Sequence, residues 1–399
     1  MRISGVGCCL LDYIYHHYSY ENESFRKLLS TAKGDGGIIP GGLVFTEDLA
    51  RFSGKHTEDL LAELVAGIEA DAVNLGGPAI VAMVHAAQLL ADQGIEVSFS
   101  GVTGTDEAGM MIRDILAKTP VNAGLRPVEG LPTPSSHVLS DPHQHGGKGE
   151  RTFLNTIGAA GEFTAEDVPE GFYRSDIVLL GGTALVPRLH DKLDTVLRTA
   201  HDLGVFTVVG TVFDFRNERR GMKRWPLGSD DAYQSIDLLI ADAVEAMRLT
   251  GTQEILASAK ALQASGVGAF IITNGAKPML GWSSAYGRIA PFELSYLPVS
   301  AFVDELLEEK PAMRKDSTGC GDNFVGGVLV SIALQMQLAP SRQVDLLDLC
   351  AWGASSGGFA CMYHGGTYFE TKPMEKLEAI APIVADYHKR LPASIRRVK

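Results

Sequence analysis

Several features of exported, membrane-inserted and nucleic-acid-binding proteins are missing from this sequence. Only five cysteines occur among 399 residues, at positions 8, 9, 320, 350 and 361, and their spacing matches no metal-ligand pattern. A reducing compartment is therefore expected, and we predict a cytoplasmic protein. The sequence has no uninterrupted apolar run of about 18 residues and no signal-peptide pattern, so we expect neither a membrane helix nor export.

Positive charge is also scarce. The chain has 35 lysines and arginines against 48 aspartates and glutamates, which gives a formal net charge of −13. Because no basic stripe is available to neutralise a phosphate backbone, we expect no nucleic-acid partner. The remaining composition, 45% hydrophobic and 21% charged residues, is typical of a folded chain with a large core.

Strand-like and helix-like patterns alternate along most of the chain. This alternation predicts an α/β fold with a doubly wound, Rossmann-like, mostly parallel central sheet covered by helices on both faces. We expect strands at 3–11, 97–102, 177–181, 205–209, 238–240 and 269–273, and helices at 57–70, 79–91, 107–118, 189–203, 243–249, 254–265 and 344–363. Short strands at 136–139 and 152–154 interrupt the pattern and indicate a small β-sheet lid.

One stretch, Asp316-Ser317-Thr318-Gly319-Cys320-Gly321-Asp322, precedes an apolar segment with helical spacing. A helix is expected to begin near Gly319, and its first N–H groups, on residues 319–321, carry partial positive charge that suits a phosphate. Asp322 follows this cradle and could take a proton from an attacking hydroxyl, which makes phosphoryl transfer the natural interpretation. The alternative is that Asp322 only caps the helix.

Polar and glycine residues follow several of the expected strands, where ligands of open α/β sheets bind. They are Asp12, Asp214, Asp242 with Glu245, and Thr273 with Gly275. Gly76 and Gly77 precede the helix at 79–91 and could let a ligand approach the backbone. Taken singly, Asp12 could be a turn residue, and the glycine pair could be the kind of turn that commonly precedes a helix without binding a ligand. Their clustering favours an active site along one edge of the sheet.

The stretch Asp316 to Asp322 resembles the C-terminal signature of the ribokinase family of carbohydrate kinases, which usually has alanine where Cys320 stands. The resemblance extends over nearly the whole chain. It includes 5–12, Gly76-Gly77, 149–152 to 158–159, 242–245 and 273–275. One departure concerns the acceptor, because Ile80 stands near the place where the family usually has an asparagine.

The resemblance implies a single ribokinase-like kinase domain over 1–399, with a lid formed by segments within about 13–45 and 121–160. It implies a kinase that uses ATP and Mg²⁺ and that forms a homodimer through the lid. Asp322 would be the catalytic base, and Gly319, Cys320 and Gly321 the anion hole for the transferring phosphoryl group. The remaining roles are acceptor binding by Asp12, Gly76, Gly77 and Arg151, nucleotide binding by Asp242, Glu245, Thr273 and Gly275, and a monovalent cation such as K⁺ at Asp316 and Thr318.

The acceptor is expected to be a sugar or sugar acid, because Glu150, Arg151, Asp12 and Asp214 offer a polar pocket. Arg151 could instead be a surface charge beside Glu150. A nucleoside kinase is the alternative if Tyr13, Tyr15 or Phe45 stacks a base. A third hypothesis is an inactive protein that binds sugar or nucleotide, against which the intact Asp322 and its glycines argue.

Overall fold

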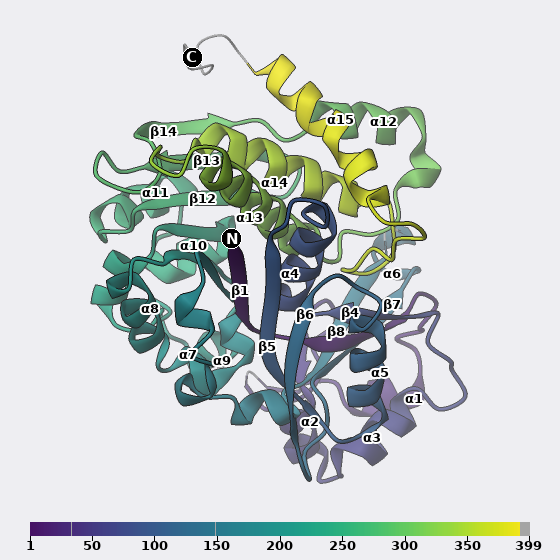
Figure 1. Ribbon diagram of the computed structural model, residues 1–399. Helices are drawn as coiled ribbons and strands as arrows, with labels where there is room; N and C mark the ends of the chain where they lie inside the picture. The colour runs from purple at the N-terminus through teal and green to yellow at the C-terminus, as the bar shows by residue number, and fades with distance from the viewer. Residues whose placement is uncertain (33, 148, 392–399) are drawn as a thin grey trace.

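Two β-sheets of different size organise the protein (Figure 1). The computed structural model describes residues 1–32, 34–147 and 149–391. The large sheet has nine strands in the order β14-β13-β12-β11-β10-β9-β1-β5-β6. The strands from β12 to β6 in this order run parallel to one another, and β13 and β14 are antiparallel. Their bounds are β1 Arg2–Gly7, β5 Glu96–Gly104, β6 Asn122–Val128, β9 Ile177–Gly181, β10 Phe206–Gly210, β11 Leu238–Asp242, β12 Ala269–Asn274, β13 Lys277–Ser283 and β14 Phe292–Leu297.

Helices cover both faces of the large sheet, which confirms the predicted doubly wound architecture. One face packs on α4 Pro78–Leu89, α5 Glu107–Leu116, α13 Cys320–Leu338, α14 Leu346–Ala360 and α15 Glu375–Arg390. The other packs on α7 Pro187–His190, α8 Leu193–Asp202, α10 Ala243–Thr250 and α11 Ile255–Ala264. The central strands are buried on both sides, and β9 and β10 are buried at every position. Continuous apolar runs are what such strands require.

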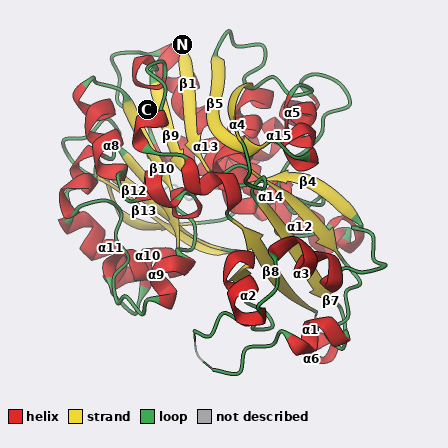
Figure 2. Ribbon diagram, turned by 90° about the horizontal axis from the view of Figure 1, so that it is seen from below, coloured by secondary structure: helices red, strands yellow, loops and turns green. Residues whose placement is uncertain are grey.

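The small sheet has the strand order β3-β8-β7-β2-β4. Its strands are β2 Leu10–Tyr15, β3 Leu43–Phe45, β4 Ala72–Gly76, β7 Ser135–Asp141 and β8 Glu150–Thr156. Helices α1 Glu23–Lys27, α2 Thr46–Ser53 and α3 Thr57–Leu64 accompany this sheet (Figure 2). Phe25, Leu49 and Leu60 from these helices share an apolar cluster with Leu139 and Leu154 of the sheet. The segment between Tyr15 and Ala72 therefore builds a second core.

The boundaries of the small sheet differ from the two segments expected for the lid. Strand β4 lies outside both 13–45 and 121–160, yet it pairs antiparallel with β2. Strand β6 lies within 121–160, yet it pairs with β5 at the edge of the large sheet. Strand propensity does not reveal the partner of a strand, so the sequence did not separate these cases.

The expected strand at 3–11 is wrong, because the chain divides there into β1 and β2, which belong to different sheets. Gly7 makes the division possible. It has a φ of +136°, and a Cβ at this position would lie 1.9 Å from the carbonyl oxygen of Gly181. Only glycine allows the chain to leave the large sheet at this close contact.

Two predicted helices also differ from the structure. The helix expected at 57–70 ends at Leu64. The helix expected at 189–203 is interrupted between α7 and α8 near Lys192. The remaining elements are α6 Gln144–Gly147, α9 Phe215–Arg219 and α12 Ala301–Glu309. Among the described residues, no helix has both the length and the apolar character needed to cross a membrane.

Candidate active site

The N-terminus of α13 is held in place by a glycine that no other residue could replace without strain. Gly319 caps the helix with a φ of +73°, and a Cβ there would lie 2.4 Å from Cα of Gly366. The Cys320 N–H donates a long bond of 3.3 Å to the Ser317 carbonyl, so it is partly used within the turn. Gly321 is exposed, and a side chain there would meet no atom within 4 Å. The amide of Gly321 is therefore the most open of the three proposed anion-hole groups.

A cavity of about 140 Å³ lies beside this helix end. It is bounded by the carboxyl ends of β9, β10, β11 and β12 and by the first turn of α13. Its lining includes Gly181, Gly210, Thr211, Asp242, Glu245, Thr273, Gly321 and Asp322. The structure thus brings together five of the predicted nucleotide-binding and catalytic residues from three separate segments of the chain.

Asp322 and Glu245 are both weakly solvated carboxyl groups at this cavity. Burial raises the pKa of Asp322 to about 6. Burial, followed by repulsion from Asp242, raises the pKa of Glu245 to about 7. A carboxyl group with a pKa near the working pH is well suited to accept a proton from an alcohol.

Asp242 and Glu245 also form a capping box at the start of α10. The Asp242 carboxylate accepts a 2.8 Å bond from the Glu245 N–H, and the Glu245 carboxylate accepts a 3.1 Å bond from the Asp242 N–H. The hydroxyl of Thr211 donates to the same Glu245 oxygen. Two carboxylates beside a phosphate-sized cavity fit Mg²⁺, which usually keeps several waters and takes one or two carboxylates together with substrate phosphates.

Asp12 lies in β2 of the small sheet, not at the end of a strand of the large sheet as expected. It is 8% exposed, and a Cβ on Gly76 would lie 2.1 Å from its Oδ2. Gly77 has a φ of +102°, and a Cβ there would lie 2.7 Å from the Cys8 carbonyl oxygen. Burial, and then repulsion from Asp322 and Asp316, raises the pKa of Asp12 to about 7. Asp12 is therefore closely packed against the Gly76-Gly77 turn, and it lies near enough to Asp322 for the charge of Asp322 to affect its pKa.

Arg151 connects the small sheet to the loop before α13. Its guanidinium donates to the Thr318 and Ser317 hydroxyls at 3.2 and 3.1 Å and lies 3.5 Å from the Asp316 carboxylate. The Glu150 carboxylate instead contacts His145, at 2.8 Å. These groups surround an open cavity of about 690 Å³ that also contains Ser140, Asp141, Arg314, Lys315 and His364. Arg151 therefore points into a cleft instead of standing as an isolated surface charge.

Two expected members of the site lie elsewhere. Gly275 is exposed in the turn between β12 and β13, with a φ of +58° and no contact that a Cβ would disturb. Asp214 is buried at the start of α9, where its carboxylate accepts bonds from Asn217 and lies 3.6 Å from His190. The expectation that Asp214 shares a polar pocket with Glu150 and Arg151 is therefore wrong.

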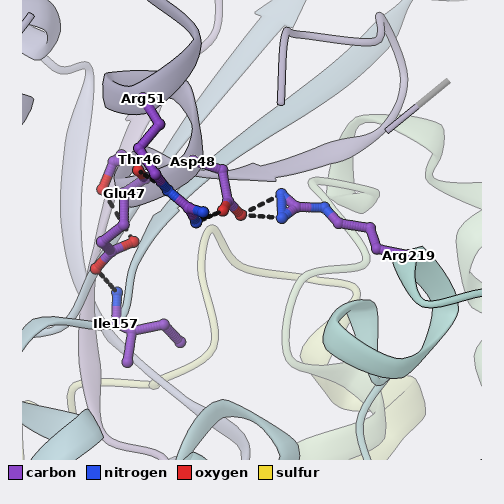
Figure 3. Close-up of polar contacts among 6 residues, drawn as sticks. All are labelled: Thr46, Glu47, Asp48, Arg51, Ile157 and Arg219. Atoms are coloured by element: carbon purple, nitrogen blue, oxygen red, sulfur yellow. Dashed lines mark hydrogen bonds and ion pairs between the residues drawn. The ribbon is translucent and has the colours of Figure 1, made fainter. Parts of the chain in front are cut away.

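One contact that joins the small sheet to the large one was not predicted from the sequence. Figure 3 shows Asp48 of α2 between two arginines, Arg51 of its own helix and Arg219 of α9. The Arg219 guanidinium lies 5.8 Å from the centre of the Phe45 ring, and that ring meets Phe215 edge-on at 6.2 Å. The arginine-rich segment 216–220 was the available signal, but its partner lies about 170 residues earlier.

Residues 48–372 match the profile of a family described as pfkB family carbohydrate kinase. The chain belongs to this family. Asp12 and the first strands lie outside the matched residues, so their placement rests on the structure. No curated protein sequence matches the chain. The family and the fold together make this protein a carbohydrate or nucleoside kinase.

Solved structures with the same fold include adenosine kinases and sugar kinases. Adenosine kinase from Schistosoma mansoni in complex with 2-fluoroadenosine is 15% identical, with a TM-score of 0.67, and covers 92% of this chain and 97% of its own. Adenosine kinase from Sinorhizobium meliloti is 18% identical at a TM-score of 0.67, covering 95% and 98%. A probable sugar kinase from Rhizobium etli is 17% identical at a TM-score of 0.67, covering 96% and 98%. At these identities the likeness shows the ribokinase fold.

The close contact of Gly319 predicts that Gly319→Ala lowers both melting temperature and turnover. The left-handed backbone alone costs an alanine about 1–2 kcal/mol, and the Cβ would also displace Gly366. Gly54→Ala is the matched control, since Gly54 has a φ of +71° and no atom within 4 Å of a Cβ. Equal losses in the two variants, measured by thermal denaturation and steady-state kinetics, would contradict the importance of the 319–366 contact.

The contact between the two sheets predicts that Arg219→Gln raises the KM for the acceptor by about 5-fold, because loss of an ion pair worth about 1 kcal/mol weakens the contact of the small sheet with α9. The KM for ATP should change less. Arg51→Gln is the control, since Arg51 contacts Asp48 within one helix and does not cross between the sheets. Identical kinetics for the two variants would show that the Arg219 contact does not control the lid.

Proposed function

We propose that this kinase transfers the γ-phosphoryl group of ATP to a hydroxyl of a sugar or sugar acid. The observation that supports this most directly is the cavity where Gly321 and Asp322 meet Asp242, Glu245 and Thr273. A helix N-terminus, a base and further carboxylates then surround one position. Phosphoryl transfer depends mainly on such positioning and on stabilisation of charge.

Each side of the cavity would serve one substrate. Asp12 and the Gly76-Gly77 turn would hold acceptor hydroxyls, and Asp322 would remove the proton from the hydroxyl that attacks. The N–H groups of residues 319–321 would stabilise the transferring group. Thr273 and Gly275 would hold the nucleotide, with Gly275 acting from its exposed turn.

Metal ions and the lid complete the proposed site. Asp242 and Glu245 would hold Mg²⁺, which neutralises phosphate charge when it is bound. Arg151 would bring positive charge from the small sheet to the loop at 316–318, where its guanidinium already donates to Thr318. A monovalent cation such as K⁺ at Asp316 and Thr318, and a homodimer through the lid, stay predictions.

A nucleoside acceptor is the second candidate, favoured by the structural likeness to adenosine kinases. The aromatic side chains give it less support than expected. Tyr13 and Tyr15 stack on His137, with centroids 4.8 and 6.0 Å apart. They alternate with Asp12 along β2, so they lie on the opposite face of the sheet. Tyr13, Tyr15 and Phe45 all line one open cavity of about 1360 Å³, whose lining includes neither Asp12 nor Asp322.

An assay of ADP release with a panel of sugars, sugar acids and nucleosides tests this proposal. We expect the highest kcat/KM with a sugar or sugar acid. A clear preference for nucleosides would replace the first candidate by the second. If the protein binds ATP but releases no ADP with any of the acceptors, the inactive binding protein is favoured and the proposed reaction is rejected.

The role of Asp322 predicts that Asp322→Asn lowers kcat by about 10²–10⁴-fold, the range typical of removing a general base. In the wild-type enzyme, kcat should fall as the pH drops through about 6, because the protonated carboxyl group accepts no proton. ATP binding by the variant, measured by calorimetry, should persist. An unchanged kcat would remove Asp322 from the mechanism. Asp12→Ala is the comparison, and it should act mainly on the KM for the acceptor.

A further inference from the structure

A buried lysine lies behind the proposed anion hole. Lys376, in the first turn of α15, is 1% exposed. Its ammonium group donates to Gln88 Oε1 at 3.1 Å and to Asn323 Oδ1 at 3.2 Å. It also lies 6.0 and 5.9 Å from the ring centres of Tyr363 and Tyr368. Amides and aromatic faces surround the ammonium group. The Glu370 carboxylate accepts a 2.9 Å bond from the Lys376 backbone N–H, and no salt bridge to the Lys376 side chain is found among the described residues.

Asn323 links this lysine to the anion hole. It directly follows Asp322 and is fully buried. Its Nδ2 donates to the carbonyl oxygens of Gly319 and Gly366, both at 2.8 Å. These are the two glycines whose close contact fixes the start of α13. The amide of Asn323 therefore bridges the helix end and the loop that packs against it.

The Oδ1 atom of Asn323 is surrounded by donors. It contacts the Lys376 ammonium, the Tyr363 hydroxyl at 3.0 Å and Nδ1 of His85 at 2.6 Å. Because burial keeps the pKa of His85 low, the ring is neutral and donates from Nδ1. Its Nε2 then accepts from the Ser356 hydroxyl at 2.8 Å. Every donor at Asn323 Oδ1 holds the amide in the orientation that bonds Gly319 and Gly366.

We propose that Lys376 is a positioning residue for phosphoryl transfer, supplying through Asn323 a positive charge at a fixed position behind the anion hole. The proposal rests on the proposed function of the 319–321 amides. A cationic donor at Oδ1 polarises the Asn323 amide, and this strengthens the bonds from Nδ2 to the helix end. The charge also adds to the positive end of α13 in a region of low dielectric.

Stability alone does not explain a lysine at this place. A charge buried without a carboxylate partner destabilises a fold, and replacement by an apolar side chain of similar shape is often neutral or stabilising. Burial lowers the pKa of Lys376 to about 7, in accordance with this cost. A phosphate at the helix end would favour the charged form. Attraction between the bound anion and the ammonium group thus offsets part of the free energy of burying the charge.

Three substitutions separate the charge of Lys376 from its packing. Lys376→Met keeps the shape and removes the charge. Gln88→Glu keeps Lys376 and places a carboxylate on its ammonium, which cancels the charge locally. Gln88→Met is the matched control, because it removes the Gln88 amide, including its 2.8 Å bond to the Tyr368 carbonyl, and leaves the bond from Lys376 to Asn323.

The first readout is the steady-state kinetics of these variants with the best acceptor. We expect Lys376→Met and Gln88→Glu to lower kcat by about 10-fold, less than the 10²–10³-fold typical of a direct oxyanion donor. KM values should change by less than about 3-fold, and Gln88→Met should stay within about 2-fold of wild type. The melting temperature of Lys376→Met should be equal or higher. Losses of activity that follow losses of melting temperature across all three variants would overturn the proposal.

The second readout needs no acceptor. ADP with Mg²⁺ and aluminium fluoride presents a planar anion in place of the transferring phosphoryl group, and calorimetry gives its affinity beside that of ADP alone. Lys376→Met should bind the fluoride complex about 10-fold more weakly than wild type, with unchanged ADP affinity. Equal affinities for the complex would reject the role of Lys376. If aluminium fluoride does not tighten ADP binding even in wild type, the anion hole itself is wrong, and the proposal fails with it.

Discussion

The approach of Gly319 to Gly366 is the constraint on which the site depends. The two backbones are so close that a single methyl group would not fit between them. This contact sets where α13 begins and therefore where its unpaired N–H groups point. Asp322 follows within the first turn, so the place of its carboxylate relative to these amides is set by helix geometry. The position of the site therefore depends on a close backbone contact that only glycine at position 319 allows.

The large sheet supplies the other half of the site through its topology. Parallel strands end at one edge, so residues far apart in the chain, such as Gly210, Asp242 and Thr273, meet at the same cavity. The small sheet contributes Asp12 and also Arg151, which donates to Thr318 in the loop before α13. Burial raises the pKa values of Asp12, Asp322 and Glu245, and repulsion from Asp322 adds to the rise at Asp12 and Glu245. Carboxylates of the small sheet, α10 and α13 are thus electrostatically coupled.

Much of this arrangement could be predicted from the sequence, because periodicity and glycine spacing are local signals. The pattern at 316–322 predicted the helix end correctly, and most strands of the large sheet were found within a few residues. The division of 3–11 into two strands was not predicted, since it depends on Gly7 touching Gly181 about 170 residues later. No pattern in the sequence around Lys376 indicated that this side chain is buried near the site. Its burial follows from the packing of α15 on α14 and α4, which no local pattern encodes.

The balance of charge explains why a buried cation is useful here. The site contains several carboxylates, and a bound nucleoside triphosphate would add further negative charge to the same region. Positive groups near it include the end of α13, Arg151 and Lys376, and Arg314 and Lys315 line the cavity beside Arg151. Arg151 belongs to the small sheet, so its position follows any movement of that sheet. Lys376 is buried beside the large sheet, where its position stays fixed, and a charge held in place costs no reorganisation when the phosphoryl group moves.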